Sequence, residues 1–194
     1  MSCSKIQICN LALTNLGADS IRSFDESNKR SRTVEAFYET ARDYILSQFD
    51  WPFAKAFVLL QLLSEVSTPS GVFAYQLPKD CISPRDIYPL SKKNYWEIFG
   101  QMLFCKSSEE VYLYYTKRVI DPNEFSDAFI SLLALWIAVR SAPSIAQDKE
   151  LANLLIKQFR IEKQECWESN ANIGNEYLKY DGDPNNDSFV FPEG

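Results

Sequence analysis

The chain has 194 residues, with 26 acidic and 20 basic side chains and a formal net charge of -6 at pH 7. It contains no histidine, which excludes Ser-His-Asp and Cys-His nucleophiles, histidine-ligated zinc and the usual general base near neutral pH. Its six glycines are too scattered for a phosphate-binding loop, and the acidic balance disfavours free binding to nucleic acid.

Two helices are predicted in the N-terminal part of the chain. Apolar residues recur at helical spacing over residues 4–16, and Gly17 follows where a C-cap glycine belongs. A second apolar stripe predicts a helix over residues 27–49. Asp50-Trp51-Pro52 ends this helix, because the residue before a proline is pushed out of the helical region.

The second predicted helix opens with a basic cluster. Lys29-Arg30-Ser31-Arg32 stands at its N-terminus, where positive charge opposes the helix macrodipole. Local stability therefore does not explain the cluster. An acidic partner and simple solubility are the two remaining explanations.

The middle of the chain predicts a small antiparallel sheet over residues 72–117. Short runs rich in aromatic and β-branched residues alternate there with clusters of Pro, Gly, Asp, Asn and Ser. Gly100-Gln101 separates two of the runs and predicts a two-residue hairpin turn. The apolar residues 54–63 before this region fit either a helix or a buried strand. The runs are residues 72–77, 82–88, 95–99, 102–105 and 111–115.

Two more helices are predicted after the sheet. Asp121-Pro122 opens one over residues 123–142, which is apolar nearly all round and should be the central buried element, and Pro143 stops or kinks it. The last helix is predicted over residues 148–170. Residues 173–194 have too little apolar content to pack alone and predict an extended or disordered tail.

Together these elements predict a mainly α protein. We expect a bundle of four long helices with a small inserted antiparallel β-sheet and a flexible C-terminal tail. Residues 1–172 would form one domain and residues 173–194 the tail. This organisation suits the length, which corresponds to one domain or one domain with an appendage.

Cysteine usage and apolar runs predict a soluble protein made and kept inside a cell. The five cysteines form no CxxC pair, and their odd number favours reduced thiols that pack as small apolar residues. The N-terminus lacks the basic and apolar regions of a signal peptide. The longest apolar stretch, residues 129–139, is far shorter than the ~20 residues of a membrane span.

Carboxylates are the abundant catalytic candidates that remain. A sugar-cleaving hydrolase needs two carboxyl groups that face each other across a cleft. Glu162 and Glu165 share one helix face but lie among lysines and an arginine, so a solvated face is the favoured interpretation. Glu109-Glu110 falls at a predicted turn and receives the same interpretation. We therefore assign no catalytic, metal-binding or cofactor-binding residue.

Several stretches in order resemble one protein family. The most specific part is Trp51-Pro52-Phe53-Ala54 at the end of a long helix, followed by Phe73-Ala-Tyr-Gln-Leu-Pro-Lys-Asp-Cys81. Further matching stretches are Ile8–Gly17, Ser20-Ile21, Ala36–Leu46, Tyr114-Tyr115-Thr116 and Phe125–Val139. Over residues 3 to 172 the set resembles tail tubular protein A, the head-to-tail adaptor or tail accessory proteins of short-tailed bacteriophages.

The resemblance implies a structural role in the virion. Such proteins form a ring, usually of twelve copies, below the portal protein, and they are made in the host cytoplasm. The ring extends the channel for genomic DNA, which passes without sequence-specific binding, and it supports the tail nozzle and tail fibres. The family has no cofactor and no membrane partner. A cell-wall-degrading activity attributed to some relatives keeps a carboxylate-dependent, muramidase-like enzyme as the alternative.

Two groups of residues are predicted to matter for assembly. Trp51, Pro52 and Phe53 are expected to form a structural joint between the helices and the sheet. The tail is expected to dock on the portal, as the C-terminal segments of the family do. Its predicted aromatic anchors are Tyr177, Tyr180, Phe189 and Phe191.

Overall fold

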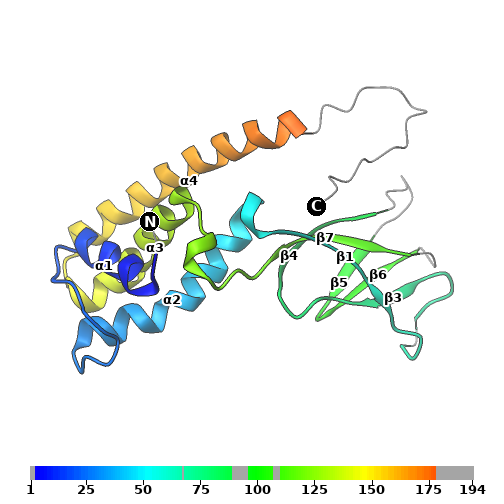
Figure 1. Ribbon diagram of the computed structural model, residues 1–194, viewed down its shortest axis with the longest axis horizontal. Coiled ribbons are helices and arrows are strands. Elements are labelled where there is room, and N and C mark those ends of the chain that lie inside the picture. Colours follow the sequence, from blue (N-terminus) through cyan, green and yellow to red (C-terminus); the bar gives the residue numbers. More distant parts are fainter. Residues whose placement is uncertain (1–2, 67, 89–95, 107–109, 178–194) are drawn as a thin grey trace.

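The molecule has a helical body and an inserted β lobe, which lie side by side in Figure 1. The computed structural model describes residues 3–66, 68–88, 96–106 and 110–177, with 169–177 described as backbone only. The residues of the lobe lie between the second and the third helix in chain order. The helices of the body are α1 (Lys5–Asn15), α2 (Lys29–Gln48), α3 (Asp127–Ile145) and α4 (Lys149–Tyr177).

Local side chains fix the ends of the helices. The Ser4 hydroxyl accepts a hydrogen bond from the backbone of Gln7, whose side chain returns one to the Ser4 backbone, so α1 begins with a complete capping box. Gly17 follows α1 at a φ of 64°, which confirms the predicted glycine cap. The Asn28 side chain caps α2, whose first turn holds no acidic residue.

Helix α3 is the centre of the body, as its sequence predicts. Helices α1, α2 and α4 all pack against it, and most of its apolar side chains are buried. By length and composition alone α3 is apolar enough to cross a membrane, but half of that apolar window is buried within the fold, as in the core helix of a soluble protein.

The β lobe consists of two antiparallel sheets. Strands β1 (Lys55–Leu59), β7 (Tyr112–Lys117) and β4 (Cys81–Tyr88) form the first in that order. Strand β1 continues through Leu60 into β2, so that one segment borders both sheets. The second sheet has the order β2 (Gln61–Leu62), β3 (Phe73–Gln76), β6 (Met102–Cys105) and β5 (Trp96–Phe99).

The lobe has its own hydrophobic core, separate from that of the helical body. The predicted hairpin at Gly100-Gln101 is confirmed, because Phe99 pairs with Met102 and Gly100 has a φ of 61°. The buried residues that form this core are Leu60, Tyr75, Leu77, Ile87, Leu103, Cys105, Val111, Leu113 and Tyr115.

The predicted fold class is therefore wrong. The strands form two sheets of three and four strands around a core of their own, not one small sheet attached to a bundle of four long helices. The first helix is also short, at 11 residues. The sequence pattern located the strands of the 72–117 region but did not show that residues 55–62 belong with them, as one edge strand of each sheet.

The helix boundaries differ from the predictions at three places. Asp121-Pro122 begins a short 3-10 turn (Pro122–Glu124), and α3 begins later, at Asp127 with Ser126 as its cap. Pro143 lies inside α3 because it falls in the last turn, where one missing backbone bond costs little while neighbouring Ala142 is buried. Helix α4 continues to Tyr177, beyond the predicted end at residue 170.

Candidate interaction surfaces

The predicted joint residues lie between α2 and β1. Trp51 is 1% exposed, and its indole Nε1 donates a hydrogen bond to the Ile45 carbonyl at 2.9 Å. Its ring meets Phe129 of α3 edge to face, with 5.1 Å between the centroids. Phe53 is half-buried and its ring lies 5.2 Å from that of Phe129, whereas Pro52 is exposed and begins the turn that leads into β1. Two aromatic side chains thus tie the entrance of the lobe to the central helix.

Arg85 of β4 fastens the lobe to the end of α2. Its guanidinium donates to the carbonyls of Ser47 and Phe49, at 3.3 and 2.6 Å, and to the Thr116 hydroxyl at 2.9 Å. Carbonyls at a helix C-terminus have no partner within the helix, and a cation there complements the helix dipole. No sequence pattern pointed to Arg85, because its partners on α2 lie far away in the chain.

Two more contacts cross the boundary between body and lobe. Arg118 pairs with Asp43 of α2 at 3.0 Å, and the Tyr114 hydroxyl donates to Asp50 at 2.5 Å. Partial burial and the Asp50 carboxylate raise the pKa of Tyr114 above its ordinary value, so the phenol stays protonated and keeps donating at neutral pH. Hydrogen bonds and an ion pair therefore join the two parts of the molecule.

One face of the sheet β1-β7-β4 carries apolar side chains toward solvent. Phe57 and Tyr112 stack at 5.2 Å between centroids, with 6° between their planes. The opposite face of the same strands supplies Leu113 and Ile87 to the core of the lobe. We call this surface the outer β face, made of Phe57, Leu59, Tyr88, Tyr112 and Tyr114, of which the first three are 44%, 47% and 45% exposed.

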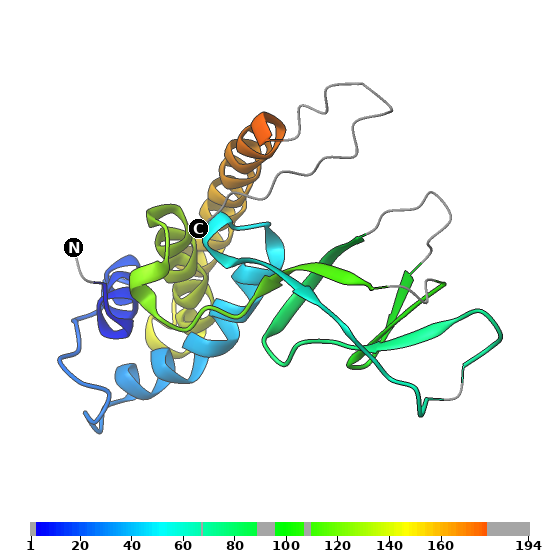
Figure 2. The same ribbon diagram turned by 45° about the vertical axis from the view of Figure 1, so that its right-hand side comes forward.

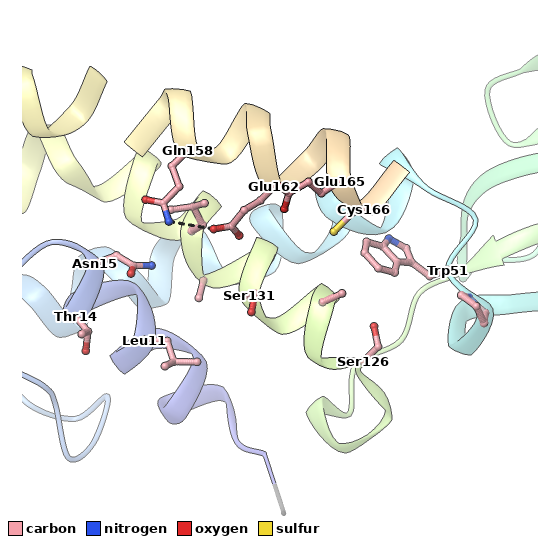
Figure 3. Close-up of a pocket in the computed structure, with 14 residues that line it drawn as sticks. Leu11, Thr14, Asn15, Trp51, Ser126, Ser131, Gln158, Glu162, Glu165 and Cys166 are labelled. Carbon is pink, nitrogen blue, oxygen red and sulfur yellow. Dashed lines mark hydrogen bonds between the residues drawn. The ribbon is translucent and has the colours of Figure 1, made fainter. Parts of the chain in front are cut away.

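A groove lies between α1 and α4 with α3 as its floor (Figure 3). Its volume is about 730 Å³, and no lysine or arginine is among the described residues that line it. The floor presents the small side chains of Ala128, Ser131 and Ala134. We call it the α1–α4 groove. Its other lining residues are Leu11, Thr14, Asn15, Trp51, Pro52, Ser126, Leu135, Gln158, Glu162, Glu165 and Cys166.

The carboxylates Glu162 and Glu165 both stand on the α4 wall of this groove. Glu162 accepts a hydrogen bond from Gln158 at 3.0 Å, and neither carboxylate forms an ion pair with a described residue. Burial, followed by these two carboxylates, raises the pKa of the neighbouring Cys166 thiol, which is therefore a neutral thiol and a poor nucleophile at pH 7. The opposite wall, on α1, supplies Leu11 and polar side chains but no carboxylate. The groove does not set two acids across a cleft.

The basic cluster at the start of α2 lies on another side of the body. Arg30 pairs with Asp19 at 2.7 Å, but Lys29 and Arg32 are exposed and form no ion pair with a described residue. Next to them, Arg140 of α3 lies over the Phe37 ring at 5.3 Å. We call Lys29, Arg32, Ala36, Phe37 and Arg140 the basic strip.

The tail anchors fall almost wholly outside the described residues. Tyr180, Phe189 and Phe191 lie outside them, and Tyr177 is described only as the last backbone residue of α4. In the part of the chain that the structure describes, no group of three or more Cys, Asp or Glu residues is placed to hold a metal ion.

No protein-family model matches the chain, and no curated protein matches it significantly. The resemblance to the phage adaptors therefore stays a prediction that rests on the sequence motifs. Sequence reasoning missed the outer β face and the α1–α4 groove. The sequence hides the first, because residues 56–59 are all apolar and only the structure shows that Phe57 and Leu59 face outward while Ala56 and Val58 face the core.

Proposed function

We propose that the chain is a structural head-to-tail adaptor of a short-tailed bacteriophage, located in the virion at the interface of head and tail. In this role it joins a ring below the portal protein, with twelve copies as the resemblance implies. The ring extends the DNA channel and supports the tail nozzle. The chain performs no reaction of its own.

The observation that carries the proposal is the outer β face on a lobe that is fixed to the helical body. Soluble monomers rarely expose a contiguous apolar patch larger than a few hundred Å², and aromatic residues are enriched where proteins meet. Here Phe57 and Leu59 stay exposed although the lobe already has a complete core on the other side of the sheet. We assign this face to the tail protein below the ring.

The path of α4 supports a second partner above the ring. Its C-terminal part extends away from the rest of the body (Figure 2) and carries the chain to Tyr177, where residues 178–194 continue. A segment that orders on its partner wraps a wide surface, which suits a permanent joint. In the proposal Tyr177, Tyr180, Phe189 and Phe191 anchor this segment on the portal.

The negative net charge of the chain is compatible with a channel through which DNA passes. With a net charge of -6, acidic side chains on the channel wall would repel DNA and let it slide without sequence-specific contacts. The muramidase alternative has no observation in its favour, because the carboxylates of the α1–α4 groove stand on one wall.

The test is reconstitution of the full chain with the portal and nozzle proteins encoded in the same genome. We expect a ring of fixed stoichiometry on the portal by electron microscopy, and loss of ring joining when residues 178–194 are deleted. Phe57→Asp should abolish nozzle binding but leave the portal ring intact. The matched control Leu62→Asp changes a side chain that is equally exposed, at 44%, but lies on the other sheet.

Two outcomes would overturn the proposal. One is a chain that forms no complex with either partner at concentrations that support assembly of the other components. The other is turnover of peptidoglycan by the purified chain, abolished by Glu162→Gln or Glu165→Gln, which would establish the enzymatic alternative.

A further inference from the structure

We infer that the α1–α4 groove of one copy receives the basic strip of a second copy of this chain, so that the copies join head to tail. This inference rests on the proposed function, because it names the surfaces through which the ring would close. The occupant follows from the charge, the position and the apolar content of the two surfaces.

The charges of the two surfaces are complementary. The groove presents Glu162 and Glu165 with no cation among the described residues that line it. The basic strip presents Lys29, Arg32 and Arg140, none of which forms an ion pair with a described residue. Charged side chains of opposite sign on two surfaces steer association and fix the register of the partners.

The position of the basic strip is consistent with a use outside its own chain. Positive side chains at a helix N-terminus oppose the helix dipole, and the first turn of α2 contains no acidic residue. Glu35 and Glu39 follow further along α2, and its later arginine, Arg42, is buried and paired with Asp43, so the exposed positive charge of α2 lies at its beginning. An acidic surface of a neighbouring copy would offset the unfavourable interaction with the dipole.

Both surfaces also have an apolar centre. The floor of the groove is made of small side chains, which let another helix approach closely, and Leu11 at its edge is 48% exposed. In the strip, Ala36 and Phe37 line a shallow hollow of about 280 Å³ with Lys29 and Arg32. The strip therefore brings apolar side chains and cations to a groove with an apolar floor and carboxylates on its α4 wall.

The two surfaces lie on opposite sides of α3. Ser131 lines the groove and Arg140 belongs to the strip, and nine residues of α-helix correspond to about two and a half turns, which places them on opposite faces. A contact between two different surfaces of identical subunits is heterologous, and it closes into a ring when the rotation between subunits allows. The contact therefore suits a ring subunit rather than a two-fold dimer.

The C-terminal segment is a poorer occupant of the groove. Residues 178–194 contain four acidic residues and one lysine, so they would meet carboxylates of the same sign. The four are Asp181, Asp183, Asp187 and Glu193. The basic strip of another copy has the opposite charge.

The experiment reverses the charge of each surface in the full chain. Variant A carries Glu162→Lys and Glu165→Lys, and variant B carries Lys29→Glu and Arg32→Glu. Self-association of the purified protein, without any phage component, is measured by sedimentation velocity up to millimolar concentration. We expect the wild type to associate, and both A and B alone to bind themselves at least about tenfold more weakly.

Mixing gives the decisive result. A has two positive surfaces and B has two negative ones, so an equal mixture should recover association as an alternating assembly. A variant with Glu150→Lys and Glu168→Lys is the matched control, because it changes the net charge as A does at exposed positions of α4 outside the groove. It should associate at least as well as the wild type, and all variants should keep the circular dichroism of the folded chain.

Three results would overturn the inference: association that A and B leave unchanged, no recovery on mixing, or a wild type that stays monomeric at millimolar concentration. Loss of association on deleting residues 178–194, with A and B unaffected, would identify the tail as the occupant. Self-association is measured with the chain alone. If the chain failed to bind the portal, the proposed function would be wrong, but the contact between groove and strip could still be confirmed.

Discussion

The helical body and the β lobe bury their apolar side chains in different ways. The body packs three helices around α3, and its large buried core includes Trp51 and Phe129. The lobe closes a smaller core between two sheets and still leaves apolar side chains on the outer β face. Stability of the chain is therefore concentrated in the body, whereas the lobe keeps apolar surface available for a partner.

The largest expected effect is at the joint. Trp51→Ala should lower the free energy of unfolding by about 3–5 kcal/mol, because it removes a buried indole and its hydrogen bond. Urea denaturation followed by circular dichroism measures the change. Trp167→Ala is the control, since that indole is 60% exposed and its loss should change stability by at most about 0.5 kcal/mol. Equal effects of the two changes would contradict the role of the joint.

A pair of leucines compares the two cores directly. Leu103 in the lobe and Leu133 in the body are both fully buried, and truncation of either to alanine should cost about 2–4 kcal/mol. Hydrogen exchange read by mass spectrometry should show faster exchange in residues 55–117 for Leu103→Ala while α3 stays protected. Faster exchange in both parts would show that the cores open as one unit.

The fastening by Arg85 determines whether the two parts unfold together. Arg85→Met keeps much of the length of the side chain but removes its bonds to Ser47 and Phe49, which should cost about 1–3 kcal/mol. We expect the single urea transition to separate into two, with the lobe unfolding first. Lys117→Met changes an exposed ion pair at 3.9 Å and should leave one transition.

At alkaline pH, ionisation of Cys9 in the body should cost more stability than ionisation of Cys81 in the lobe. Burial raises the pKa of Cys9 from 9.0 to about 12, and that of Cys81 in the lobe only to about 11. The unfolded thiol of Cys9 ionises first, so its contribution to stability is complete below about pH 9 and is lost as the pH rises toward 12. Through Cys9, the free energy of unfolding should fall by at most about 1.4 kcal/mol per pH unit. Cys9→Ala should flatten the curve of unfolding free energy against pH more than Cys81→Ala.

The smallest expected loss of stability comes from substitution of two glycines, one in each part of the molecule. Gly17 after α1 and Gly100 in the hairpin have φ values of 64° and 61°, and a Cβ at either position would meet no atom within 4 Å. Alanine at each should therefore cost about 1 kcal/mol from the backbone alone. Urea midpoints measure both, and asparagine variants should recover part of the loss. A much larger loss at one position would indicate a contact beyond backbone conformation.

The sequence predicted most elements because their signals are local. Ser4 with Gln7, Gly17 and the Gly100 turn act within a few residues, and the apolar stripes of α1, α2 and α3 follow the helical period. Residues 54–63 were ambiguous because apolar side chains point both inward and outward along β1, which hides the period of two.

The surfaces could not be predicted in the same way. The groove joins Leu11, Ser131 and Glu162, which come from three helices, and their proximity depends on how those helices pack. Arg85 likewise contacts the end of α2, which lies far from it in the sequence. Charge patterns did locate the basic cluster of α2, but not that Arg30 pairs with Asp19 while Lys29 and Arg32 have no ion pair among the described residues.

The chain enters the β lobe at Lys55 and leaves it after Thr116, and these two residues face each other across an antiparallel pair. Their Cα atoms lie only about 5 Å apart, as in any such pair. A module inserted through two adjacent points can be lengthened, replaced or removed without pulling the surrounding helices apart. One part of this molecule can thus diversify to recognise a new neighbour while the other continues to hold an old one.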